Sequence, residues 1–296
     1  MPTRLPLAAV VLVAASLLVA GCDSNEPAPA PAPSPGVVGP GDEYVAMGDS
    51  YTSGPRMGHT QAGCLRGSKS YPFLVADELK LDLTDVSCGG ATSEAVWNSY
   101  TPPHGTTQPP QVSAVTDSTA LVTFSFGGND EHLYSKFLAV CVTPGSDEAL
   151  RGSPCTRIDK KAYGYVHGVI SRTRDRLVHS LNRVVTAAPN AQVVVVGYPR
   201  FAPEHPCAEF PIAEGDVALA LRLNRGLVRA QKHAAEEAGA DYVDLFAATE
   251  GHDMCAKDPW LAGMEPTAPA APYHPYQKEQ QVAADLVTEL VRKSQP

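Results

Sequence analysis

The sequence predicts an α/β fold in which helices cover both faces of a parallel, doubly wound sheet of about five strands. From residue 42 onward, short runs of apolar and β-branched residues alternate with longer segments of helical periodicity. One run, Val193-Val194-Val195-Val196, has no polar alternation, as expected of a strand that is buried on both faces. In such a sheet, functional loops lie beyond the carboxyl ends of the strands.

The strands are expected at residues 43–47, 83–87, 120–126, 192–198 and 241–245. Helical periodicity predicts helices at residues 71–80, 160–187, 216–238 and 277–292. Residues 131–159 show no clear helix or strand pattern. We expect them to form a loop, closed by a disulfide, that lies over the site at the carboxyl ends of the strands.

The first 21 residues have the pattern of a secretory signal, because Arg4 precedes an uncharged apolar run over residues 5–20. The run ends in Val19-Ala20-Gly21-Cys22, which resembles the bacterial lipobox. That resemblance implies cleavage before Cys22 and a diacylglyceryl thioether on its sulfur, which would attach the protein to the membrane outside the cytoplasm. The alternative is an ordinary secretory signal in which Cys22 is incidental.

Residues 22–41 read as a tether, since proline and alanine alternate there with almost no large apolar side chain. Such a segment favours extended polyproline geometry. One domain is then expected over residues 42–296, of globular composition with 44% hydrophobic and 19% charged residues. The net charge of -9 argues against a nucleic-acid partner, which requires a cationic face. We expect a monomer.

Six cysteines follow Cys22: Cys64, Cys88, Cys141, Cys155, Cys207 and Cys255. In an exported chain the even count predicts three disulfides, and the lack of a Cys-x-x-Cys motif argues against a structural zinc site. Sequence alone allows about fifteen pairings. We favour pairing in sequential order, because each pair would then close a loop at one end of the predicted sheet. Free buried thiols are the alternative.

Four short motifs stand at the ends of predicted strands or before the last helix: Gly48-Asp49-Ser50-Tyr51, Cys88-Gly89-Gly90-Ala91, Gly127-Gly128-Asn129-Asp130 and Tyr273-His274-Pro275. Their order and content resemble the SGNH (GDSL) hydrolase family, whose motifs supply a serine, a glycine, an asparagine and a histidine in this order. The resemblance covers residues 43–290 and points to the secreted bacterial esterase and lipase branch with three disulfides. It implies a three-layer α/β/α, flavodoxin-like fold.

The resemblance also implies roles for the four residues. Ser50 would be the nucleophile and His274 the base, because acyl transfer needs an activated oxygen and a group that titrates near neutral pH. The oxyanion hole would come from the backbone N–H of Ser50, the backbone N–H of Gly90 and the side-chain amide of Asn129. Taken singly, Ser50 and Asn129 would be turn residues, and His274 a solvated loop histidine.

One departure from the family concerns the acid of the catalytic triad. Most members carry an aspartate three residues before the histidine, but this position is Ala271. The branch that the chain resembles uses the backbone carbonyl there, which implies a Ser50–His274 dyad oriented by the Ala271 C=O. The alternative is a remote acid, Asp253 or Asp258, that folds back onto His274.

The sequence therefore predicts a serine esterase or lipase that hydrolyses a carboxylic ester, either a small molecule or a lipid. Thioesterases, lysophospholipases and carbohydrate acetylesterases share the motifs and remain alternatives, as does a non-catalytic lipoprotein that binds a solute or partner. The motifs for an α/β-hydrolase elbow, a phosphate loop, a dinucleotide fold and a zinc protease do not occur. No metal and no cofactor is expected.

Overall fold

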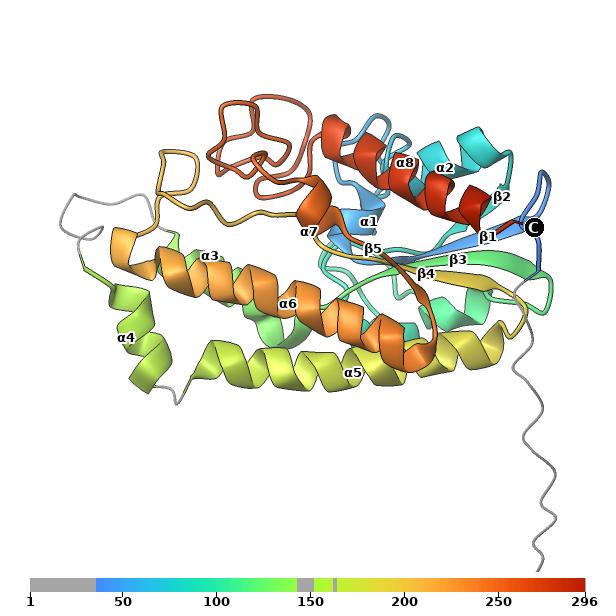
Figure 1. The fold of residues 1–296 in the computed structure, drawn as a ribbon, viewed down its shortest axis with the longest axis horizontal. Helices are drawn as coiled ribbons and strands as arrows, with labels where there is room; N and C mark the ends of the chain where they lie inside the picture. Colours follow the sequence, from blue (N-terminus) through green and yellow to red (C-terminus); the bar gives the residue numbers. More distant parts are fainter. Residues whose placement is uncertain (1–35, 143–151, 162–163, 296) are drawn as a thin grey trace, which may run out of the picture. The chain divides into compact units, whose positions relative to one another are not determined.

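Five parallel strands form one sheet in the order β2-β1-β3-β4-β5 in a computed structural model that describes residues 36–142, 152–161 and 164–295 (Figure 1). The strands are β1 (Glu43–Gly48), β2 (Asp82–Asp85), β3 (Thr119–Ser125), β4 (Gln192–Val196) and β5 (Asp241–Val243). All five predicted strands are confirmed, with ends that differ by at most two residues. The strand order and parallel register are those of a doubly wound α/β fold.

The four predicted helices are present as α2 (Tyr71–Leu79), α5 (Tyr165–Ala187), α6 (Val217–Ala238) and α8 (Gln277–Lys293). Helix α5 begins later than predicted, after Gly164, which adopts a left-handed conformation with φ of 75°. Further elements are the short helices α1 (Ser50–Ser53) and α7 (Leu245–Ala248) and the 3-10 turns η1 (Ser93–Val96), η2 (Gln111–Ala114), η3 (Asp130–His132) and η4 (Glu214–Asp216).

The expectation that residues 131–159 lack regular structure is wrong, because this segment contains α3 (Leu133–Cys141) and most of α4 (Pro154–Lys161). Leu133 and Phe137 lie one turn apart and are both buried, and the Cys141–Cys155 disulfide joins the two helices. Each helix is too short to show a clear period in the sequence. Residues 143–151 lie outside the described part of the chain.

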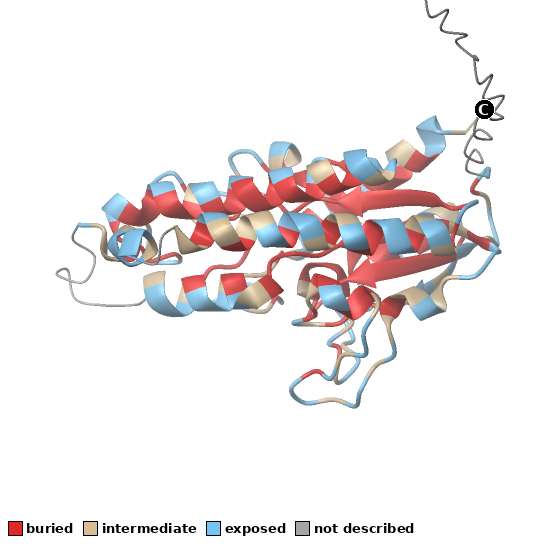
Figure 2. Ribbon diagram, turned by 90° about the horizontal axis from the view of Figure 1, so that it is seen from below, coloured by how far each residue is buried: buried red, intermediate tan, exposed pale blue. Residues whose placement is uncertain are grey.

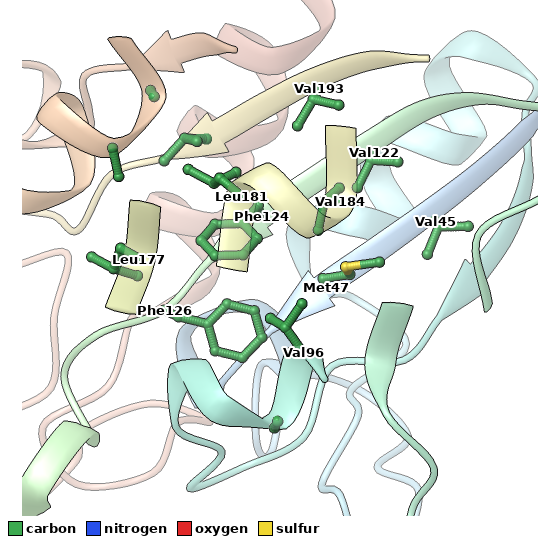
Figure 3. Packing of buried hydrophobic residues seen from close by; sticks show 14 of the residues in the cluster. Val45, Met47, Val96, Val122, Phe124, Phe126, Leu177, Leu181, Val184 and Val193 are labelled. Carbon is green, nitrogen blue, oxygen red and sulfur yellow. The ribbon is translucent and has the colours of Figure 1, made fainter. Parts of the chain in front are cut away.

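Helices pack on both faces of the sheet, as the alternation of side chains along β1 requires. Tyr44 and Ala46 face α2 and α8, whereas Val45 and Met47 face the side covered by α5 and α6 (Figure 1). Figure 3 shows the second layer, where strand side chains pack against Leu177, Leu181 and Val184 of α5. Every residue of β4 is buried, and the strands visible behind the helices in Figure 2 are coloured as buried.

The three predicted disulfides are confirmed in sequential order: Cys64–Cys88, Cys141–Cys155 and Cys207–Cys255. The first holds the loop after β2 against the loop after α1, where the Gly89 N–H also donates to the Cys64 carbonyl at 2.9 Å. The signal, Cys22 and the first part of the tether lie outside the described residues. No helix in the described part of the chain is long and apolar enough to cross a membrane.

Glu279 lies fully buried in the first turn of α8. Its carboxyl accepts a hydrogen bond from the Gln280 side-chain amide at 2.8 Å. Burial raises the pKa of Glu279 to about 8, because the charged form loses its hydration, and this hydrogen bond only partly opposes the shift. Folding therefore favours the protonated carboxyl, so the folded state holds a proton that the unfolded state releases above its own pKa of about 4.5.

We predict that the stability contributed by Glu279 is fully present below pH 4.5 and is lost as the pH rises toward 8. The Glu279→Gln variant keeps a neutral acceptor and does not titrate, so the free energy of unfolding should depend less on pH. Urea unfolding at pH 5 and pH 8 should show that wild type loses about 2 to 4 kcal/mol more than the variant over this range. The same pH dependence in both proteins would contradict the assignment.

Candidate active site

Ser50 lies at the first position of α1, directly after the buried strand β1. The Asp49 carboxyl caps this short helix by accepting the Tyr51 N–H at 2.9 Å. Gly48 is required before the turn, because a Cβ there would overlap the Thr52 side chain. The strand and the tight turn therefore hold the Ser50 side chain at the carboxyl edge of the sheet.

A cavity of about 170 Å³ brings three of the predicted site residues together, since Ser50, Asn129 and His274 all line it. The rest of the lining is mostly apolar and aromatic: Tyr51, Tyr134, Ser135, Phe137, Leu138, Phe201, Met254, Pro272 and Tyr273. Gly90 is not part of this lining. Residues more than 200 positions apart in the chain thus share one apolar concavity, the kind of site that favours a small apolar ligand with a few polar contacts.

The His274 ring is oriented by a backbone carbonyl, because its Nδ1 lies 2.7 Å from the Pro272 oxygen. A carbonyl only accepts hydrogen bonds, so Nδ1 carries the proton and Nε2 has a free lone pair. Burial lowers the pKa of His274 below its usual 6.5, and the hydrogen bond to Pro272 opposes part of this shift. At neutral pH the ring is therefore a neutral imidazole with Nε2 available as a base.

The predicted carbonyl was one residue off. The Ala271 C=O accepts the backbone N–H of His274 at 3.2 Å and closes a turn, whereas the Pro272 C=O contacts the ring. The cause is the left-handed conformation of Tyr273, whose φ is 61°. This backbone turn brings the carbonyl two residues before the histidine to the ring, and the sequence does not reveal it.

Neither remote acid reaches His274 among the described residues. Asp253 accepts the backbone N–H of Cys255 at 2.9 Å. Asp258 accepts the Trp260 indole N–H at 3.2 Å and lies 3.5 Å from the His252 ring. Both carboxyls are therefore engaged in their own loop.

The backbone donors expected for an oxyanion hole are free. The N–H groups of Ser50 and Gly90 have no acceptor in the described part of the chain, whereas the Gly89 N–H is bonded to Cys64. Gly90 has φ of 80°, and a Cβ at this position would come within 2.8 Å of the Tyr100 hydroxyl. This position therefore favours glycine, and the choice of Gly90 over Gly89 agrees with the hydrogen bonding.

The Asn129 amide bridges two of the four motifs. Its Nδ2 donates to the Ala91 carbonyl at 3.0 Å and to the Asp49 carboxyl at 3.4 Å. These contacts fix the side chain after β3 against the loops after β1 and β2. Both N–H groups of the amide are therefore engaged, and the longer bond to Asp49 is the one that an oxygen at the cavity could replace.

The Asp49 carboxyl is the buried centre of this arrangement, although no role for it was expected from the sequence. The Tyr198 hydroxyl donates to it at 2.5 Å and accepts the Gly128 N–H at 2.8 Å. Burial raises the pKa of Asp49 to about 7, although the hydrogen bonds from Tyr198 and Tyr51 lower it. The aspartate was visible in its motif, but Tyr198 follows a distant strand and carries no sequence signal.

Tyr51 was also missed, and it links the turn of Ser50 to the turn of His274. Its hydroxyl donates to the Tyr273 carbonyl at 2.8 Å, and its ring centre lies 5.4 Å from that of His274. Tyr273 has the left-handed backbone that presents Pro272 to the ring. The hydrogen bond therefore helps to hold a conformation that a non-glycine residue adopts only at a cost.

Comparisons with known proteins point to one family. The model of the GDSL-like lipase/acylhydrolase family matches residues 46–281. Lipase 2 from Streptomyces coelicolor is 34% identical over 220 residues, which cover 72% of each chain.

Two solved structures are similar over nearly the whole of their own chains. Phospholipase A1 from Streptomyces albidoflavus NA297 has a TM-score of 0.69 and 29% identity, and the extracellular lipase from Streptomyces rimosus has a TM-score of 0.67 and 26% identity. In each case the match covers 86% of this chain and 99% of the other. The chain therefore belongs to the GDSL-like lipase/acylhydrolase family and is a serine ester hydrolase.

Proposed function

We propose that the protein hydrolyses carboxylic esters of lipids through a Ser50–His274 dyad that contains no carboxylate. One observation carries this proposal. Ser50 and His274 line the same apolar cavity, and the only oxygen bonded to the His274 ring among the described residues is the Pro272 carbonyl. The ring thus has the tautomer that a base needs without help from an acid.

The reaction follows from these groups. As Ser50 Oγ forms a bond to the ester carbon, its proton passes to His274 Nε2, and the carbonyl oxygen becomes an oxyanion. When the tetrahedral intermediate collapses, the imidazolium returns the proton to the leaving alkoxide, which departs as an alcohol. A water molecule then attacks the acyl-Ser50 ester by the same steps, releasing the carboxylic acid and restoring the serine.

The carbonyl of Pro272 is a neutral dipole, so it supports the imidazolium less than a carboxylate would. Stabilisation of the transition state would therefore depend more on the hydrogen bonds that the oxyanion accepts. These would come from the Ser50 N–H, the Gly90 N–H and the Asn129 amide. Such donors act strongly where water is excluded. The mostly apolar lining of the cavity supports this arrangement.

The lining also favours an acyl chain as the part of the substrate that occupies the cavity. Tyr134, Phe137, Leu138, Phe201 and Met254 offer apolar surface, whereas a carbohydrate acetylesterase needs polar groups for a sugar. Two of the similar proteins are named a phospholipase A1 and a lipase, which act on lipid esters. We therefore favour a lipid ester over a thioester or an acetylated sugar.

The enzyme is proposed to act outside the cytoplasm, attached to the membrane through a lipid on Cys22. The apolar run before Cys22 and the proline-rich segment after it support this proposal. The similar lipase from Streptomyces rimosus is described as extracellular. Two acyl chains on Cys22 would anchor the protein stably, whereas a single chain binds a membrane only marginally.

We predict that Asn129→Ala lowers kcat about 10²- to 10³-fold with little change in KM, because its amide would bond the oxyanion and not the ground state. Steady-state hydrolysis of p-nitrophenyl butyrate measures the effect. The exposed Asn98 offers a matched control, and Asn98→Ala should retain wild-type rates. A kcat loss below tenfold in folded Asn129→Ala would remove Asn129 from the oxyanion hole.

The dyad predicts that Asp253→Asn and Asp258→Asn each leave kcat within about tenfold of wild type. In a serine protease triad, the corresponding change of the aspartate costs about 10⁴-fold, because the histidine then has the wrong tautomer. The same ester assay decides between the two, with circular dichroism to verify folding. A loss near 10⁴ in either variant would show that an acid orients His274 after all.

If Cys22 carries the lipid, we predict that Cys22→Ser either releases the protein from the membrane or leaves its signal uncleaved. The serine cannot form the thioether. Membrane fractionation and the mass of the product measure this outcome. The lipid anchor would be wrong if the variant still fractionated with membranes at its mature mass.

A further inference from the structure

A second apolar cavity, of about 290 Å³, lies beside helix α3. Its walls come from α3, α4 and the first turns of α5 and α6, and Figure 1 shows α3 and α4 where these two long helices begin. The apolar side chains that matter here are Leu133, Phe137, Val140, Ile158, Val166 and Leu219. Val140 and Ile158, at its mouth, are 51% and 53% exposed. The catalytic reaction described above makes no use of this cavity.

Phe137 separates the second cavity from the site cavity. Within the described part of the chain, it is the one residue that lines both. On the same helix, Tyr134 and Leu138 line only the site cavity, whereas Leu133 and Val140 line only the second. Phe137 is 5% exposed and packs in the hydrophobic cluster that also contains Tyr51, so its ring is a fixed part of the partition.

The second cavity offers little to a polar ligand. Lys136 and Asp159 are its charged lining residues. The Lys136 amine lies 3.2 Å from the Tyr165 hydroxyl, and the Asp159 carboxyl accepts the Val166 N–H at 2.8 Å. With these groups engaged, the remaining surface suits a hydrocarbon chain, which gains free energy in proportion to the apolar area that it buries.

We infer that Phe137 is a specificity-determining residue that stops the acyl chain of the substrate at the end of the site cavity. This inference rests on the proposal that the acyl chain occupies that cavity. The aromatic ring excludes long chains from the second cavity, so wild type favours acyl chains that end before Phe137. Removal of the ring joins the two cavities and admits a longer chain.

The test compares kcat/KM for p-nitrophenyl butyrate, octanoate, laurate and palmitate in wild type and Phe137→Ala, at one fixed detergent concentration. Each methylene that enters the joined cavity should raise kcat/KM about fourfold. The ratio of laurate to butyrate should therefore rise at least tenfold in the variant. Phe137→Leu, which keeps more of the packing, should shift the ratio in the same direction by a smaller factor.

A filling substitution provides the matched control. Val140→Trp places a large side chain at the mouth of the second cavity, on an exposed position of α3. In wild type it should leave the laurate-to-butyrate ratio unchanged, because Phe137 already excludes the chain. In the Phe137→Ala background it should return the ratio toward the wild-type value.

Two results would overturn the inference. One is an unchanged ratio in both Phe137 variants while they fold and hydrolyse butyrate. The other is a lowered ratio in Val140→Trp alone, which would mean that the chain already passes Phe137 in wild type. Failure of the proposed function is distinct, since wild type would then hydrolyse none of the four esters. If Phe137→Ala does not fold, Phe137→Leu and Val140→Trp decide the question.

Discussion

The arrangement of the active site depends on one buried carboxyl, that of Asp49. It caps the helix that begins with Ser50, accepts the Tyr198 hydroxyl and lies beside the Asn129 amide. These contacts join the carboxyl ends of β1, β3 and β4, which the sheet order places next to one another. A buried carboxyl is tolerated only when it is hydrogen-bonded, so the three loops hold one another in place. Burial raises the pKa of this carboxyl to about 7, because the charged form loses its hydration.

The histidine turn differs, because its hydrogen bonds within the described part of the chain come from backbone groups and the Tyr51 hydroxyl. The Pro272 carbonyl fixes the ring, and Tyr51 bonds the strained residue between them. Since Tyr51 directly follows Ser50, the proposed nucleophile, the same short helix positions both Ser50 and the turn that carries His274. A neutral acceptor also adds no further carboxylate to a site where burial and the nearby Asp130 already disfavour the ionised form of Asp49.

The sequence predicted the elements whose signals are long or repeated. The five strands and the long helices followed from hydrophobic periodicity, and Ser50, Asn129 and His274 followed from the order of the motifs. Helices α3 and α4 were missed because each is too short to show a clear hydrophobic period. The Pro272 carbonyl depends on one backbone angle at Tyr273, and the roles of Tyr198 and Phe137 depend on contacts between distant segments. Periodicity and motif order do not contain such information.

The most direct measurement of the central claim is covalent labelling with a fluorophosphonate, followed by peptide mapping. A hydrolase with an activated serine attacks the phosphorus and displaces fluoride, so wild type should carry one adduct, on the peptide that contains Ser50. His274→Ala should label far more slowly, because no base then removes the serine proton. Folded protein that takes up no label, or that carries it on a residue other than Ser50, would contradict the account.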